Sequence, residues 1–99
     1  MSDDASFAAP PFKPDEALQR LRRELRELGL AEREGHFERR GQVVARAALE
    51  GAALKAAAVK RPGRSPDWQP ERTLMTSADL RHFVAALKTN LARWTDAAD

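Results

Sequence analysis

Two stretches of the chain, one near each end, carry leucines and aromatic residues at helical spacing. The first follows Pro14 and repeats apolar residues every three or four positions, which places them on one face of a helix. Its apolar positions are Leu18, Leu21, Leu25 and Leu28. Gly29 stands where this helix would end and Leu30 follows it, an order typical of a glycine C-cap. We therefore expect an amphipathic helix between Pro14 and Gly29, with Asp15 supplying a capping side chain at its start.

The second stretch begins after Thr76 and Ser77, either of which can cap a helix. Asp79 falls in the first turn, where the positive end of the helix dipole favours an acidic group. The apolar positions form one continuous stripe: Leu80, Phe83, Val84, Leu87, Leu91 and Trp94. The opposite side carries His82, Thr89 and Arg93. The pattern predicts a second amphipathic helix that ends near Thr95.

Between these helices, glycine-containing dipeptides recur about every ten residues, a spacing typical of short strands joined by turns. They are Arg40-Gly41, Glu50-Gly51 and Pro62-Gly63. Small apolar residues alternate with more polar ones between the glycines, as in a half-buried strand. We predict strands near 35–40, 42–49 and 53–61. Connections this short exclude crossovers, so neighbouring strands would run antiparallel.

The predicted fold is α+β in the order α-β-β-β-α, a three-stranded antiparallel meander packed on one face by two amphipathic helices. A competing interpretation follows from the many alanines of the middle region, which favour a single helix over residues 42–60. Gly51 lies in the centre of that segment and costs a helix about 1 kcal/mol relative to alanine. The alternative architecture is therefore an all-α bundle.

A length of 99 residues fits one domain. We place a globular domain at 14–95, after a disordered lead-in over 1–13 that contains Pro10 and Pro11, and before a frayed tail over 96–99. The chain has no cysteine, which excludes disulfides and thiolate ligands. It also has no apolar run of the roughly 20 residues that span a bilayer, and its start is acidic where a signal peptide would be basic. We expect a cytoplasmic protein.

Candidate catalytic and metal-binding residues are few. His36 and His82 are the only histidines, and nothing supplies a further ligand at zinc spacing. Ser77, Asp79 and His82 share one predicted helix, where capping explains the first two. The glycines match no phosphate-binding loop. We therefore expect no enzymatic activity, no metal and no cofactor, and no small-molecule substrate is evident.

The charge distribution points to one candidate binding segment. The net charge is only +2, but residues 42–61 carry four cations and one acid. A loop with three prolines follows and contains a tryptophan. The candidate binding residues are Lys55, Lys60, Arg61, Arg64 and Trp68. Cations can neutralise phosphates and an indole can stack on a base. The competing interpretation is a connecting loop whose Trp68 covers the core while the charges stay in water.

Two functional hypotheses follow. The leading one is a small non-catalytic protein-interaction module, because two strongly patterned helices would leave one sheet face open and two strand edges unpaired. Its partner would be another protein or a second copy of the chain, paired edge to edge as a homodimer. The alternative is a nucleic-acid-binding protein that uses the basic strand and loop segment 55–68.

Overall fold

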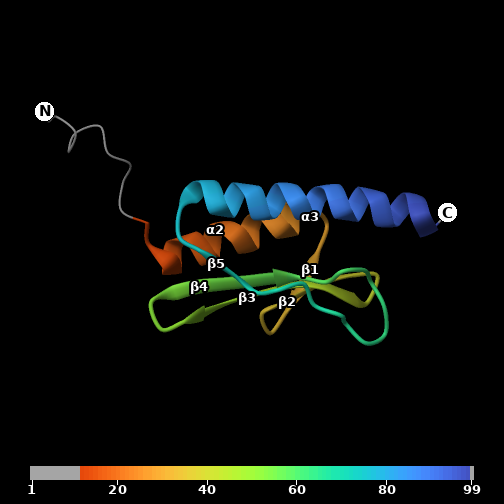
Figure 1. Cartoon of the computed structure of the whole chain (residues 1–99), viewed down its shortest axis with the longest axis horizontal. Coiled ribbons are helices and arrows are strands. Elements are labelled where there is room, and N and C mark those ends of the chain that lie inside the picture. The colour runs from red at the N-terminus through yellow and green to blue at the C-terminus, as the bar shows by residue number, and fades with distance from the viewer. Residues whose placement is uncertain (1–11, 99) are drawn as a thin grey trace, which may run out of the picture.

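The computed structural model describes the backbone of residues 12–98 and the side chains of residues 12–95. It contains an antiparallel five-stranded sheet preceded by helix α2 (Pro14–Glu27) and followed by helix α3 (Ser77–Ala98) (Figure 1). The strands are β1 (Ala31–Arg33), β2 (His36–Arg39), β3 (Gln42–Glu50), β4 (Ala53–Ala58) and β5 (Arg72–Leu74). They lie in the sheet in their order along the chain. The predicted α+β class is confirmed.

The predicted three-stranded meander is wrong in its number of strands. The three expected strands correspond to β2, β3 and β4, while β1 and β5 add one further strand at each edge. Each edge strand has three residues, too few for an alternating pattern to show in the sequence. The all-α alternative is also wrong, because residues 42–60 form β3 and β4 rather than a helix.

Glycines at positive φ close the hairpins at two of the three recurring dipeptides and at Glu34-Gly35, whereas Pro62-Gly63 lies in the loop between β4 and β5. Arg40 and Gly41 between β2 and β3 have φ values of 55° and 80°. Glu34 and Gly35 between β1 and β2 have φ values of 51° and 82°. Two consecutive positive φ angles define the type I′ turn, whose twist matches that of the flanking strands. Gly51, at φ 62°, opens the turn between β3 and β4.

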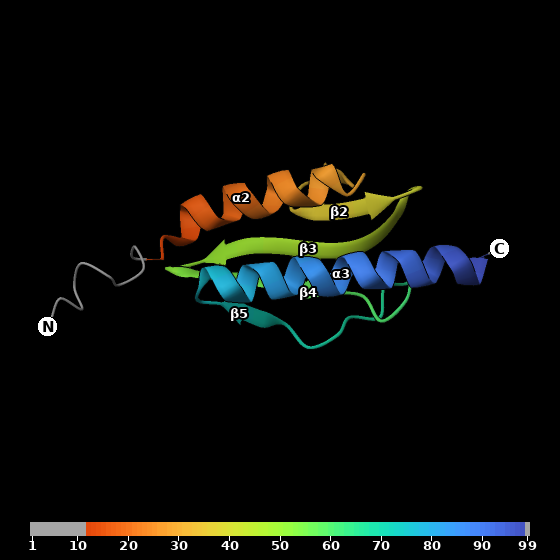
Figure 2. The same ribbon diagram turned by 90° about the horizontal axis from the view of Figure 1, so that it is seen from above.

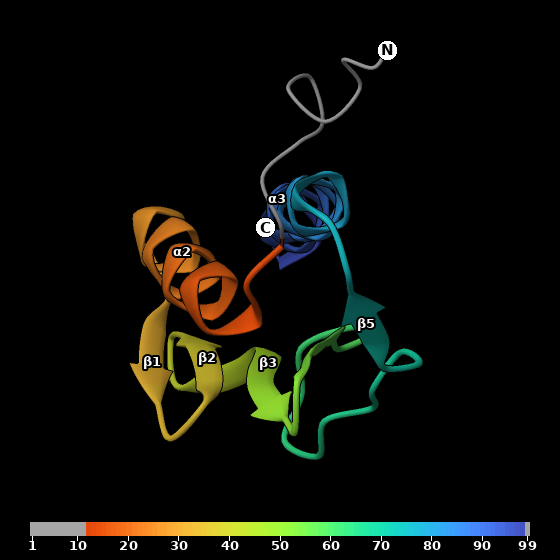
Figure 3. The same cartoon turned by 90° about the vertical axis from the view of Figure 1, so that its left-hand side faces the viewer.

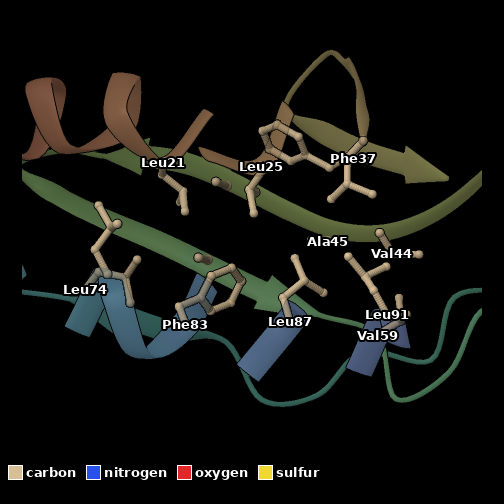
Figure 4. Close-up of a cluster of buried hydrophobic side chains, with 14 of the residues drawn as sticks. Leu21, Leu25, Phe37, Val44, Ala45, Val59, Leu74, Phe83, Leu87 and Leu91 are labelled. Carbon is tan, nitrogen blue, oxygen red and sulfur yellow. The ribbon is translucent and has the colours of Figure 1, made fainter. Parts of the chain in front are cut away.

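Both helices lie on the same face of the sheet (Figure 3). Helix α2 lies on the side of β1 and β2, whereas α3 lies on the side of β4 and β5, and Figure 2 shows α3 running alongside β4. The core fills the space between the layers, with α2 leucines facing α3 side chains above the sheet (Figure 4). Its labelled members are Leu21, Leu25, Phe37, Val44, Ala45, Val59, Leu74, Phe83, Leu87 and Leu91.

Helix α2 begins at Pro14 and ends before Gly29, as the sequence predicts, but its N-cap differs from the expectation. The N–H of Leu30 donates to the carbonyl of Leu25 at 3.3 Å, and the N–H of Gly29 donates to that of Arg26 at 2.9 Å. This pair of bonds, with Gly29 at φ 90°, is the Schellman motif. At the other end, the N-cap is Lys13 and makes no side-chain capping bond, since Pro14 occupies the first turn. Asp15 lies inside the first turn rather than at the N-cap, and its carboxylate accepts the N–H of Glu16 at 2.9 Å.

Helix α3 begins with a reciprocal capping box. The hydroxyl of Thr76 accepts the N–H of Asp79 at 3.0 Å, and the Asp79 carboxylate accepts the N–H groups of Met75 at 2.9 Å and Thr76 at 3.2 Å. The bond from the Met75 backbone is the main cause that lowers the pKa of Asp79 below its usual value. Of the two expected caps, Thr76 is the one used. The predicted apolar stripe is buried, with Val84 partly so.

The two ends of the predicted domain are tested only in part. Of the lead-in over 1–13, residues 1–11 lie outside the described residues, while Phe12 is partly buried against the core. Helix α3 continues to Ala98, but the side chains beyond Thr95 are not described. The disordered lead-in and the frayed tail stay predictions. Neither described helix is long and apolar enough to cross a bilayer.

Candidate binding surface on the open sheet face

The face of the sheet that points away from the helices carries the candidate site. Phe37 on β2 and both Ala45 and Ala47 on β3 are buried in the core. Side chains alternate across a strand, so their neighbours His36 and Arg46 lie on the opposite face. These two residues are cross-strand partners. No helix of the described chain covers this open face (Figures 1 and 3).

The loop between β4 and β5 returns to the end of β4 and holds Trp68 there. A β-bridge pairs Trp68 with Val59. The N–H of Gln69 donates to the carbonyl of Ala58 at 2.8 Å, and its side-chain Nε2 donates to the carbonyl of Val59 at 3.2 Å. Backbone pairing on both sides of the tryptophan therefore fixes where its side chain starts. This explains how a loop with three prolines presents a positioned indole.

The Trp68 ring joins an aromatic and cationic cluster on the open face. The Arg46 Cζ lies 4.6 Å from the centroid of the indole, within the range of a cation–π contact. The His36 ring lies 6.3 Å from the same ring, centroid to centroid. An Arg46 guanidinium nitrogen lies 3.7 Å from a Glu71 carboxylate oxygen. We call His36, Arg46, Trp68 and Glu71 the Trp68 cluster.

Arg46 is the centre of this cluster. Its Nε is buried and has no hydrogen-bond partner among the described residues, although the side chain as a whole is 41% exposed. An unmet buried N–H costs free energy, so the stacked indole compensates only in part. The exposed end of the guanidinium remains accessible from solvent. The Arg46 side chain therefore has a buried Nε next to the sheet and a solvent-exposed end.

A pocket of about 110 Å³ lies beside the cluster. Its charged lining residues have both signs: Glu34, Glu50 and Glu71 against Arg46 and Lys55. His36 completes the polar lining. Three acids and two cations leave this part of the open face with little net charge.

The five residues that the sequence singled out do not form one basic patch. Lys55 lies on the open face and its Nζ donates to the Thr73 hydroxyl at 2.7 Å. Lys60 lies 3.9 Å from the carboxylate of Asp67. Both lysines are thus engaged within the chain.

The other three predicted residues go to three places. Trp68 stacks on Arg46, and Arg64 is exposed in the loop. Arg61 lines a different pocket, together with Arg39 and Arg40. Trp68 is also partly buried and packs against the core, as the competing interpretation of the loop expected, and it does not line the pocket that Arg61 lines.

Sequence reasoning missed His36, Arg46 and Glu71 as partners of Trp68. The alternation of β3 placed Arg46 on the polar face, which was a usable signal. The strand register decides which side chains lie next to Arg46. This register shifts between Phe37 and Glu38 in the β2–β3 pairing. A shift of this kind cannot be read from local sequence.

The described residues contain no group of three or more His, Asp or Glu side chains placed to hold a metal ion. Comparisons with protein-family models, curated proteins and solved structures found no match to this chain. Its function is therefore argued from the geometry of its own residues.

Proposed function

We propose that the protein is a non-catalytic protein-interaction module that binds its partner through the open face of the sheet. The observation that carries the proposal is the Trp68 ring, held 4.6 Å from the Arg46 guanidinium on a face that no described helix covers. Tryptophan and arginine are the residue types that most often dominate binding energy at protein interfaces. Here Arg46 lies on β3 and Trp68 is paired with the end of β4, so both belong to the same sheet.

Contacts within the chain hold the residues of the cluster. Backbone pairing to β4 positions Trp68, and contacts with Trp68 and Glu71 hold Arg46. Binding loses less conformational entropy when the contacting side chains are already fixed. A preorganised aromatic and arginine pair therefore supports a role in recognition.

The charges of the open face favour a protein partner over a nucleic acid. A phosphate backbone is bound by an excess of cations, whereas here Arg46 faces Glu71 and Lys60 faces Asp67. Mixed charges suit a protein surface of complementary pattern. The nucleic-acid hypothesis for segment 55–68 remains the alternative proposal, and the experiment below includes it.

A second copy of the chain is the other candidate partner. Edge pairing would have to use β1 or β5, each three residues long. Such short edges offer few backbone groups and are a common protection against edge-to-edge association. We therefore place a homodimer contact, if one forms, on the open face rather than at an edge. Light scattering after size-exclusion chromatography measures it directly.

The test compares four forms of the full chain as bait: wild type, Trp68→Ala, Lys55→Glu and the control His82→Ala. His82 is exposed on α3, away from the open face. Proteins retained by wild type and by the control should be lost from Trp68→Ala and weakened by Lys55→Glu. Loss of a hot-spot side chain costs about 2 kcal/mol or more, a drop of roughly thirtyfold in affinity.

Thermal melts of each form establish that the variants are folded. Equal retention by all four forms, or a monomer with no specific partner, contradicts the proposal. Binding of labelled single-stranded DNA or RNA at low salt, with quenching of Trp68 fluorescence, would replace it with the nucleic-acid function.

A further inference from the structure

Three arginines gather around a pocket at the end of the sheet that is distinct from the open-face cluster. The pocket has a volume of about 340 Å³, at the lower end of the range of small-molecule sites. Arg39 and Arg40 come from the end of β2 and its turn, and Arg61 from the segment after β4. The remaining lining residues are Gln42, Val44, Pro62 and Trp94. Among the side chains that the structure describes, no carboxylate lines this pocket.

The positive charge of this pocket is not neutralised within the described side chains. The ion pairs among residues 12–95 lie elsewhere, and none of them includes Arg39, Arg40 or Arg61. Val44 is fully buried and Trp94 is 8% exposed, so the pocket has an apolar wall. Low-polarity walls strengthen the field of nearby charges.

One of the three guanidinium groups is held in position. Arg39 Nη1 donates to the Thr95 hydroxyl at 2.7 Å and to the carbonyl of Leu91 at 3.1 Å. The Thr95 hydroxyl itself donates to the Leu91 carbonyl at 2.9 Å. These bonds fix the guanidinium through Nη1. Its Nε and Nη2 make no hydrogen bond to the described residues and remain available as donors.

Arg40 occupies a costly backbone position beside this pocket. Its φ of 55° is what the first central position of a type I′ turn requires, and Asn, Asp or Gly adopt it most readily. A residue with a Cβ at positive φ costs roughly 1 kcal/mol or more. Glu34 has the same conformation in the turn between β1 and β2, so the angle reflects the turn rather than the pocket.

From these observations we infer that the pocket binds a phosphate monoester. A phosphate group carries a charge close to −2 at neutral pH and three acceptor oxygens, which three guanidinium groups can share. A single carboxylate pairs with one guanidinium group through two parallel hydrogen bonds, so it does not need three arginines. The apolar wall of Val44, Pro62 and Trp94 accommodates the ester substituent. The site shares no residue with the Trp68 cluster, so it is independent of the proposed function.

The experiment titrates the ¹⁵N-labelled full chain with phenyl phosphate at low salt and follows its NMR spectrum. The indole N–H signals of the two tryptophans serve as internal reporters. Binding should shift the Trp94 signal and the amide signals of Arg40 and Gln42 in a saturable way, and leave Trp68 unchanged. Inorganic phosphate should bind more weakly, because it lacks the apolar substituent, and benzoate weaker still.

Substitutions test the arginines individually. Arg40→Gln and Arg61→Gln should each weaken phenyl phosphate binding by about tenfold, since each removes a charge-assisted contact. Arg64→Gln is the matched control, an exposed arginine of the same loop that does not line the pocket. It should change affinity little. Arg39 is left intact because it also anchors α3.

Three results would overturn the inference. One is a shift that does not saturate up to roughly 10 mM ligand. Another is a loss of affinity in Arg64→Gln equal to that in Arg61→Gln, which indicates attraction by general charge. The third is binding of benzoate or inorganic phosphate as tight as that of phenyl phosphate, which excludes a monoester site.

Discussion

Two residues other than glycine, Glu34 and Arg40, have positive φ angles in the described chain. Each precedes a glycine in a tight turn between strands, and each therefore occupies a conformation that β-carbon sterics disfavour. Gly35 has a further constraint, because a β-carbon there would lie 3.3 Å from the carbonyl oxygen of Ala47. At this scale, single backbone angles set the direction of the hairpins that place His36 beside Arg46.

Asp79 supplies a prediction about pH at the same scale. Its pKa in the folded chain is lowered from the usual 3.8, so its carboxylate stabilises the fold fully above the unfolded pKa. That contribution is lost as the pH falls through the folded pKa. Asp79→Ala should therefore lower the thermal midpoint at neutral pH, and the difference from wild type should shrink in acid below 3.8.

The control for this measurement is Thr76→Ala, which removes the uncharged half of the capping box. Loss of such a cap costs about 0.5–2 kcal/mol. Its destabilisation should persist at an acidic pH where that of Asp79→Ala has shrunk. Thermal melts across pH, followed by circular dichroism, distinguish the two. A difference in thermal midpoint between Asp79→Ala and wild type that stays constant with pH would contradict the assigned capping role.

Among the elements, β3 and β4 depend on alanines where strands usually carry larger residues. Ala45, Ala47 and Ala56 are buried on the face that the helices cover, and Ala47 pairs directly with Ala56. Small side chains there leave room for the leucines and aromatic residues of α2 and α3. The same composition made a helix over 42–60 plausible from sequence. The strands form because the glycine turns and the helix layer stabilise them.

Enlarging one of these alanines tests that packing. Ala56 is fully buried, so Ala56→Leu should destabilise the protein by about 1–3 kcal/mol through overpacking. Ala48 is exposed and lies on the open face of β3, and Ala48→Leu should change stability by less than about 0.5 kcal/mol. Urea denaturation of both variants measures the difference. Similar effects from the two would show that the helices do not pack closely over Ala56.

For the molecule as a whole, stability depends on the single core shared by both helices and the sheet. A domain of 99 residues has a total unfolding free energy of only about 5–15 kcal/mol. Arg39 also ties β2 to α3, since its bonds reach Leu91 and Thr95. These contacts across the layers predict that sheet and helices unfold together.

The core prediction at this scale uses Leu87, which is fully buried on α3. Leu87→Ala should cost about 2–5 kcal/mol, whereas Leu49→Ala, at a position 40% exposed, should cost much less. Denaturation followed both by circular dichroism and by tryptophan fluorescence should give coincident transitions in each. Two separate transitions would show that the sheet and the helices unfold as independent units.

The sequence alone determined the features that depend on neighbours along the chain. The apolar stripes of both helices, the glycine C-cap at Gly29 and the glycine turns between the central strands all follow from contacts within a few residues. Trp68 was also singled out from its sequence context, and its role as a binding residue stays a prediction. For these features, local chemistry and regular spacing carry the information.

Only the tertiary structure decided the two edge strands and the composition of both proposed sites. Strands of three residues form because a neighbouring strand and a helix hold them. A three-residue sequence pattern is too short to predict such contacts. Arg46 meets Trp68 through strand register and the return of the loop between β4 and β5. Arg39 and Arg61 line one pocket although β3 and β4 separate them along the chain. Contacts between distant segments depend on the energy of the whole packed arrangement, which residue spacing does not encode.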